Sequence, residues 1–288
     1  MANSILTVMT EQYDSMTRSD KKLANYILDN SHDVQYLSIN SLAKNSGVSE
    51  ATITRFCHKL KLASYYDLKI ALAKSERTAN SYDFADSFVS FEAILDTDTP
   101  DIVCKKLCDA YAAAFEQTRE QLSNETIRKA TDILSAAEHV YCFGQGGSMV
   151  IAMEAWARFS TVSQNFIHIA DSHMQMMATA LATPRDAILF FSYSGATIEL
   201  QDVLQLATDR NVPFILVTHF CNSSIARLAD LTLYCGFNES PLQGGSVAAK
   251  MGQLLLIDCL FHDYCNRNAK VYNTARLNTI EALSGKLL

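Results

Sequence analysis

The chain has 288 residues, of which 49% are hydrophobic and 19% are charged. This length allows about two domains, and the apolar content is enough to bury a core, which excludes an intrinsically disordered protein. No apolar run reaches the roughly 18 residues of a membrane-spanning helix, and residues 1–10 lack the features of a secretory signal. We therefore expect a cytoplasmic protein that does not enter a membrane, with its eight cysteines reduced and buried.

The formal net charge of −7 argues against nucleic-acid binding until it is divided along the chain. Residues 1–80 carry ten Lys and Arg against eight Asp and Glu, a charge of +2, whereas residues 81–288 carry fourteen against twenty-three, a charge of −9. Such asymmetry is expected when only one domain contacts a phosphate backbone. A mixed-charge solvated surface would give a similar pattern.

Residues 1–75 are helical in period and almost free of strand signals. Thr17 to Asp20 matches a capping box before an apolar stripe at helical spacing, and Ser38 can cap a second, short helix. Gly47 supplies the positive φ of a tight turn, Ser49 caps a third helix over 50–60, and a fourth covers 66–74. The sequence predicts an all-α N-terminal domain over 1–75. The third helix is expected to direct toward the core Ala51, Ile53, Phe56 and Leu60.

Residues 76–100 are rich in Ser, Asp and Thr and are typical of a linker. Helices over 101–122 and 124–137 follow, and then short apolar runs alternate with helical segments, the signature of βαβ units. The predicted strands cover 139–143, 165–169, 187–192, 213–218 and 231–235, and the last long helix covers 246–268. We expect residues 101–288 to form an α/β domain with a five-stranded parallel sheet flanked by helices.

A helix, a glycine turn and a second helix with a polar outer face match a helix-turn-helix. This motif presents the start of its second helix to the major groove of DNA. Ser49, Thr52 and Arg55 share one face at three-residue spacing and are candidates for base edges or phosphates. The alternative is that Ser49 only caps the helix and Arg55 is an ordinary surface charge. The predicted DNA-binding residues are Ser49, Glu50, Thr52, Thr54, Arg55, His58 and Lys59.

Two strand-to-helix turns in the second domain are rich in glycine and hydroxyl groups. They span residues 144–148 and 192–197, each at the carboxyl end of a predicted strand, where open α/β sheets bind ligands. Backbone amides at a helix N-terminus and nearby hydroxyls suit the oxygens of a phosphate monoester, although two ordinary capped turns would look the same. The candidate phosphate-binding residues are Gly147, Ser148, Ser192, Ser194, Gly195 and Thr197.

The segment over 41–60, together with Met16-Thr17 and residues 24–28 and 67–69, resembles the N-terminal domain of the MurR/RpiR transcriptional regulators. Lys61 stands where these regulators usually have a glycine after the third helix. A left-handed Lys61 would be strained, or else the helix ends differently. The resemblance implies a helix-turn-helix that binds operator DNA.

The two turns resemble the sugar isomerase (SIS) domain that these regulators carry, and the combined resemblance covers roughly residues 5–75 and 105–268. It implies phosphate binding by Ser148, Ser192, Ser194 and Thr197. It also suggests that His173, in the segment after the second strand, lines the pocket, with a structural histidine as the alternative. Tyr193 and Ala196 stand where many members have His or Gln and Glu, so the resemblance does not identify the sugar.

A phosphosugar isomerase that interconverts aldose and ketose is the main alternative. Such an enzyme needs a base that moves a proton between adjacent carbons. Glu239, in the glycine-rich loop before the last helix, is the best-placed candidate, ahead of His173, His219 and Lys250. Because no second acid or base pairs with it, we interpret Glu239 as a loop charge or a contact to a ligand hydroxyl, and we expect no catalytic residue.

A nicotinamide-binding domain is the other alternative. Its G-x-G-x-x-G fingerprint would require a glycine where Met149 stands, and Asp171 lies 27 residues past Gly144 rather than the usual roughly 20. The cysteines and histidine within 259–265 match no zinc pattern. We therefore expect neither a cofactor nor a metal site.

These observations together predict a regulator of sugar or amino-sugar metabolism that is controlled by a phosphorylated sugar. Helix-turn-helix proteins usually dimerise so that two recognition helices meet adjacent half-sites of double-stranded operator DNA, and the SIS resemblance also implies dimerisation. We expect a homodimer or homotetramer.

Overall fold

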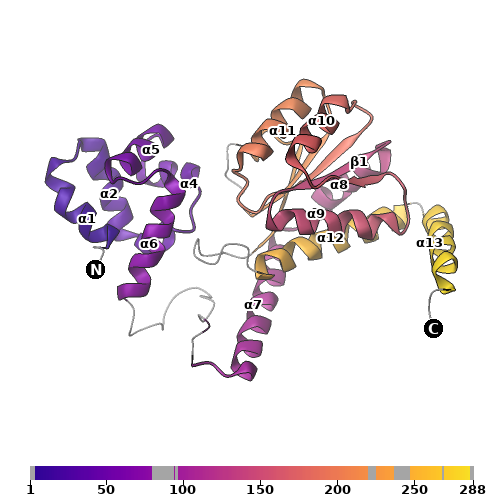
Figure 1. Ribbon diagram of the computed structural model, residues 1–288, viewed down its shortest axis with the longest axis horizontal. Helices are drawn as coiled ribbons and strands as arrows, with labels where there is room; N and C mark the ends of the chain where they lie inside the picture. The colour runs from indigo at the N-terminus through magenta and orange to yellow at the C-terminus, as the bar shows by residue number, and fades with distance from the viewer. Residues whose placement is uncertain are drawn as a thin grey trace. The chain divides into compact units, whose positions relative to one another are not determined.

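The computed structural model describes residues 4–79, 94, 97–219, 225–236, 247–267 and 269–285, without the side chains of residues 32 and 76–79. The described chain forms two compact units, residues 4–79 and the residues from 94 onward (Figure 1). The predicted linker over 76–100 overlaps the first unit, because the last helix of that unit continues to Ala79. Residues 80–93, 95 and 96 of the linker lie outside the described chain.

The first unit is all-α, as predicted. Hydroxyl side chains begin its helices where the sequence indicates: Ser38 and Ser49 each accept a hydrogen bond from a first-turn amide, and Thr17 and Asp20 form the predicted capping box. Its helices are α1 (Ile5–Gln12), α2 (Arg18–Asp29), α3 (Ser31–Val34), α4 (Ile39–Ser46), α5 (Glu50–Lys59) and α6 (Tyr65–Ala79), with a 3₁₀ turn over Tyr13–Ser15.

One predicted core position of α5 is wrong. Ala51 is exposed, whereas Ile53, Phe56 and Leu60 are buried as predicted and Cys57 is buried beside them. Positions 53, 56, 57 and 60 follow the spacing of a single helical face. Ala51 lies on the other side of the helix, so helical geometry explains the error.

The second unit is an α/β domain, as predicted. Its five strands are all parallel, in the order β2-β1-β3-β4-β5, and each lies within one residue of its predicted bounds. The strands are β1 (Val140–Gly144), β2 (Phe166–His168), β3 (Ala187–Phe191), β4 (Phe214–Thr218) and β5 (Leu231–Tyr234). The helices are α7 (Pro100–Gln121), α8 (Asn124–Ala136), α9 (Gly147–Ser160), α10 (Ser172–Leu181), α11 (Ile198–Asp209), α12 (Val247–Arg267) and α13 (Ala269–Ser284).

Helices cover both faces of the sheet (Figure 1). Successive residues of β1 point to opposite faces: Cys142 belongs to a core shared with α8, α9 and α12, and Phe143 belongs to a core shared with α11. Because the strands run the same way, their carboxyl ends and the loops into α9, α10 and α11 lie along one edge of the sheet. That edge carries both predicted ligand turns.

Two features of the second unit differ from the sequence-based expectations. The helix α13 was not predicted, and none of its residues is buried. Cys104 and Cys108 are exposed on α7, so the prediction of buried thiols is wrong for these two, whereas Cys57, Cys142 and Cys235 are buried. The seven cysteines of the described chain are free thiols, and none of its helices is long and apolar enough to cross a membrane.

Candidate functional site

The turn between α4 and α5 has the geometry that its glycine predicts. Gly47 has φ +63°, and the Nζ of Lys22 donates a hydrogen bond of 3.1 Å to its carbonyl oxygen. Immediately afterwards, the Ser49 hydroxyl accepts a hydrogen bond of 3.2 Å from the amide of Thr52 and begins α5. The two helices are therefore joined by a short, fixed turn, as a helix-turn-helix requires.

The outer face of α5 carries a connected row of polar side chains. The hydroxyls of Ser49 and Thr52 lie 2.9 Å apart, and Nη2 of Arg55 donates to the Thr52 hydroxyl at 3.3 Å. The predicted three-residue spacing thus does place these side chains on one face. Thr54, Arg55, His58 and Lys59 are exposed, and Glu50 is half-buried.

Lys59 has a partner inside the first unit. Its Nζ lies 2.5 Å from Oδ2 of Asp20, whose side chain is only 4% exposed. Burial acts to raise the pKa of the Asp20 carboxyl, but the hydrogen bonds from Lys59 and Thr17 and the charge of Lys59 outweigh it, so the pKa lies below its usual value. The end of α5 is therefore tied to the start of α2, and a DNA-binding role for Lys59 stays a prediction.

Lys61 adopts the left-handed conformation, with φ +61°. The amide of Leu62 donates to the carbonyl of Cys57 at 2.9 Å, and the amide of Lys61 donates to the carbonyl of His58 at 3.0 Å. This pair of bonds is the Schellman motif, in which glycine usually occupies the position of Lys61. Lys61 is therefore a left-handed residue, the first of the two alternatives, and the helix does not end in a different way.

The two predicted ligand turns are neighbours, because β1 and β3 pair with Gly144 opposite Phe191. In the first turn, a Cβ at Gly144 would lie 2.6 Å from the carbonyl oxygen of Ser148, and Gly146 has φ +53°. The turn therefore requires small residues. Gly147 begins α9, and Ser148 is half-buried in the first turn of that helix.

The second turn is held by its own backbone and by β4. The amide of Ser192 donates to the carbonyl of Val217 at 3.0 Å, and the amide of Gly195, with φ +58°, donates to the carbonyl of Ser192 at 3.2 Å. Ser192 is buried, Ser194 is exposed, and Thr197 caps α11 through a 3.4 Å bond from the amide of Leu200. Both turns thus end at a helix N-terminus, the backbone arrangement that favours anions.

Lys250 brings a positive charge to the first turn. A Cβ built on Gly147 would lie 3.4 Å from Cε and 3.6 Å from Nζ of Lys250, which belongs to α12. From the sequence alone, this lysine is only a weak candidate base. Because the two residues are more than 100 positions apart, no local pattern could have paired them. A lysine ammonium beside a helix N-terminus is suited to binding an anion.

The segment after β2 completes this edge of the sheet. The Asp171 carboxylate caps α10 by accepting from the amide of Met174 at 2.9 Å, and His173 is exposed in the first turn. The buried Gln175 donates to the carbonyl of Ile169 at 2.7 Å and accepts from Nε2 of Gln145 at 2.7 Å. Gln175 therefore fixes the first ligand turn, a role that the sequence did not reveal.

The remaining predicted site residues can be placed only in part. Glu239 lies outside the described residues, so its proposed contact has no structural account. Within the described chain, no group of three or more His, Cys, Asp or Glu side chains is arranged to hold a metal ion.

Comparison with known protein families identifies two matching segments. Residues 3–79 match the helix-turn-helix domain of the rpiR family, and residues 133–263 match the SIS domain. These segments contain, respectively, the α4–α5 turn and both ligand turns.

Relatives that align along most of this chain are helix-turn-helix transcriptional regulators. The chain is 32% identical over 257 residues to an uncharacterised HTH-type transcriptional regulator of Caldanaerobacter subterraneus, covering 89% of each chain. It is 28% identical to the HTH-type transcriptional regulator HexR of Pseudomonas aeruginosa, covering 89% of this chain and 87% of HexR.

Solved structures have a similar fold. The NanR protein of Vibrio vulnificus, solved in complex with ManNAc-6P, superimposes with a TM-score of 0.85 at 24% identity and covers 98% of this chain and 99% of NanR. The sugar isomerase domain of an RpiR transcription factor from Sphaerobacter thermophilus covers 63% of this chain and 98% of its own length, with a TM-score of 0.54 and 19% identity.

Proposed function

The chain belongs to the RpiR family of helix-turn-helix transcriptional regulators with an SIS domain, and we propose that a phosphorylated sugar bound by its SIS domain controls its binding to DNA. The observation that carries this proposal is the meeting of two helix N-termini, several hydroxyls and Lys250 at the ends of β1 and β3. The regulated genes would belong to sugar or amino-sugar metabolism.

The phosphate group would lie between the two turns. Amides at the starts of α9 and α11, near Gly147 and Gly195, would donate to its oxygens, and Lys250 would neutralise part of its charge. The hydroxyls that would complete the site are those of Ser148, Ser192, Ser194 and Thr197. Because each oxygen of a phosphate monoester can accept more than one hydrogen bond, this set of donors fits it better than a neutral sugar hydroxyl.

The sugar moiety would extend toward α10, and Glu239, which lies outside the described residues, would be a further contact. His173 is exposed at the start of α10, on the same sheet edge as the two turns. The ManNAc-6P of the NanR complex supports an amino-sugar phosphate as the first ligand to test. Contacts to His173 and Glu239 would select the sugar, since the phosphate contacts are common to all such esters.

The DNA-binding surface would be the outer face of α5. Helix N-terminal residues of a recognition helix contact base edges in the major groove, and the row of Ser49, Thr52 and Arg55 occupies that position. Glu50, Thr54, His58 and Lys59 would flank it. Operator binding would require two copies of the chain, as a homodimer or homotetramer in the cytoplasm.

We propose a sensor in preference to an isomerase, because the relatives described above are transcriptional regulators. Isomerase turnover on hexose and amino-sugar phosphates tests this preference directly. Turnover that is lost in Glu239→Gln would make the protein an enzyme.

A thermal-shift screen of the full chain tests ligand binding. We expect ManNAc-6P or a related ester to raise the melting temperature, since a ligand at 100 times its Kd adds about 2.7 kcal/mol of stability, whereas the unphosphorylated sugar should not. The double variant Ser194→Ala, Thr197→Val should lose the shift and retain DNA binding. A normal shift in that variant would show that the phosphate site is wrong.

A further inference from the structure

Tyr193 connects the second ligand turn to α7. It lies between Ser192 and Ser194 in sequence, and its side chain packs with that of Tyr111 against a cluster of buried alanines. The cluster consists of Ala110 and Ala114 of α7 and Ala248 and Ala249 of α12. A residue at the centre of the proposed phosphate turn therefore packs against a cluster to which α7 contributes, and α7 is the first helix of the second unit after the DNA-binding unit in the chain.

A series of hydrogen bonds makes the same connection through the sheet. The carbonyl of Tyr193 accepts from the hydroxyl of Thr218 and from the amide of His219, each at 3.1 Å. The His219 ring stacks on the Tyr193 ring, with centroids 5.2 Å apart, and its Nδ1 lies 2.9 Å from the carbonyl oxygen of Cys235. A carbonyl can only accept, so this nitrogen carries the proton.

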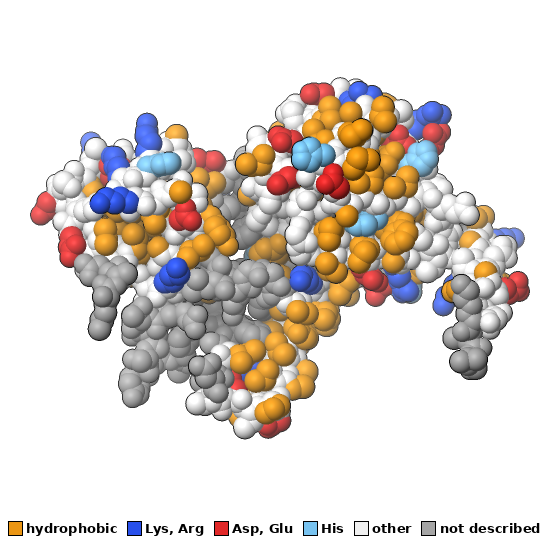
Figure 2. Space-filling view, in the orientation of Figure 1, with side chains coloured by type: hydrophobic (Ala, Val, Ile, Leu, Met, Phe, Trp, Pro, Cys, Tyr) orange, Lys and Arg blue, Asp and Glu red, His pale blue; other side chains and the backbone are white. Residues whose placement is uncertain are grey.

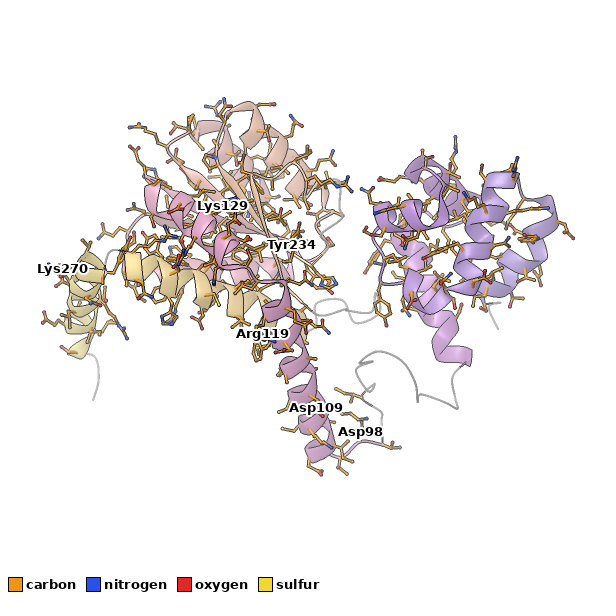
Figure 3. The ribbon with its side chains drawn as sticks, turned by 180° about the vertical axis from the view of Figure 1, so that it is seen from behind. Asp98, Asp109, Arg119, Lys129, Tyr234 and Lys270 are labelled. Atoms are coloured by element: carbon orange, nitrogen blue, oxygen red, sulfur yellow. The ribbon has the colours of Figure 1, made fainter. Side chains whose placement is uncertain are left out.

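Gly236, which follows Cys235, continues this series of hydrogen bonds into α7. The amide of Gly236 donates to the hydroxyl of Thr118 at 2.9 Å, and that hydroxyl donates to the carbonyl of Ala114 at 2.7 Å. A Cβ on Gly236 would lie 2.7 Å from the backbone nitrogen of Thr118, and one on Gly252 of α12 would lie 2.7 Å from the Thr118 hydroxyl. Figure 3 labels Arg119 of α7, which follows Thr118, and Tyr234 of β5, which precedes Gly236 by two residues. Glycine at positions 236 and 252 therefore allows α7 to approach the residues after β5 and the start of α12 closely.

We propose that Tyr193 is the positioning residue through which ligand binding at Ser192 and Ser194 changes the position of α7. This inference rests on the proposed function. A ligand can shift an equilibrium between two arrangements only if it binds them with different affinity. The packing of Tyr193 belongs both to the ligand turn and to the surroundings of α7, so a ligand that favours one arrangement of the turn would also favour one position of α7. Coupling of this kind is reciprocal, so a change in α7 should also affect the turn.

Amide hydrogen exchange of the full chain without ligand tests the coupling itself. Tyr193→Ala should speed exchange of the amides over 110–118 by roughly tenfold, whereas Tyr193→Phe, which keeps the ring, should leave it near the wild-type rate. Thr118→Val should in turn speed exchange over 192–197. Unchanged exchange of α7 in Tyr193→Ala would overturn the proposal, whatever the ligand is.

A second measurement adds ManNAc-6P, with inorganic phosphate as the simpler probe, and follows DNA affinity on a duplex selected from a random library. In the wild-type chain the ligand should change the Kd for DNA by roughly 5- to 150-fold, the usual range of allosteric coupling. At a probe concentration that protects residues 192–197 of the variant, Tyr193→Ala should lose the effect on DNA, and an effect of wild-type size would overturn the proposal. If neither probe protects residues 192–197 of the wild-type chain from exchange, the proposed phosphate site is wrong. The exchange of α7 in Tyr193→Ala without ligand still tests the coupling in that case.

Apolar side chains are also exposed on the two helices that flank the edge strand β2: Val150, Met153 and Trp156 on α9, and Met174, Met177 and Leu181 on α10. Figure 2 shows hydrophobic side chains on this unit's surface.

Discussion

Lys61 holds a backbone conformation that glycine adopts without strain, and Lys61→Gly should therefore stabilise the first unit. A residue with a Cβ in the left-handed region costs roughly 1–2 kcal/mol. Glycine loses more conformational freedom on folding, which offsets about 0.4–1 kcal/mol of that gain. The expected net gain in the free energy of unfolding is about 0.5–1 kcal/mol, since the two hydrogen bonds of the motif are made by backbone atoms that the substitution keeps.

For a unit of this size, such a gain raises the melting temperature by about 2–8 °C. Differential scanning calorimetry of the full chain, combined with amide exchange of the buried α5 residues Ile53 and Phe56, would assign the change to the first unit. Lys61→Ala is the matched control, because it removes the same side chain and keeps the Cβ, and it should give no gain. Equal stability of the two variants would refute the explanation by backbone strain.

Three further predictions concern the proposed sites. Arg55→Ala should weaken DNA binding by about 1–3 kcal/mol in an anisotropy titration, with Lys129→Ala on α8 as an unaffected control; equal losses would remove Arg55 from the interface. Lys250→Ala should weaken calorimetric binding of a phosphorylated sugar by roughly tenfold or more, and an equal loss for the unphosphorylated sugar would contradict the phosphate contact. Asp20→Asn should flatten the acid side of the stability profile: the wild-type carboxyl stabilises the fold above its unfolded pKa of about 3.9, and that contribution is lost as the pH falls through the lower folded pKa. Chemical denaturation between pH 2 and 6 measures it, and parallel profiles would show that the pair with Lys59 does not contribute.

The fold was predictable where a local signal coincides with burial. Strands such as β3, AILFF, are buried along their whole length and are bounded by turn residues, so a continuous apolar run defines them. Hydroxyl side chains that cap a helix, such as Ser49, likewise marked where helices begin. The helix α13 has no buried residue and mixes polar with apolar positions, so it offers no pattern from which to infer a core-facing stripe.

The residues of the candidate sites show the same difference between local and long-range signals. Ser49, Thr52 and Arg55 were placed on one face because three-residue spacing in a helix is a local rule. No role in the first ligand turn was predicted for Lys250 or Gln175, because their partners Gly147 and Gln145 lie 103 and 30 residues away along the chain and only the folded sheet brings them together. Spacing predicts faces of one element, and it does not predict which elements meet.

The net charge of the whole chain is a poor guide to its ligands, because the two proposed ligands, a phosphate ester and DNA, are both anions that would be bound by different units. Residues 81–288 carry a charge of −9, yet the site proposed there places Lys250 and two helix N-termini around a single phosphate. Helix-terminal charge acts only within about one turn, and exposed charges beyond roughly 8–10 Å are screened, so the distant carboxylates weaken such a site little. DNA, in contrast, presents a long row of phosphates, and the same acidic surface repels it. The charge distribution would thus let one unit bind an isolated phosphate while it directs the polyanion to the other unit.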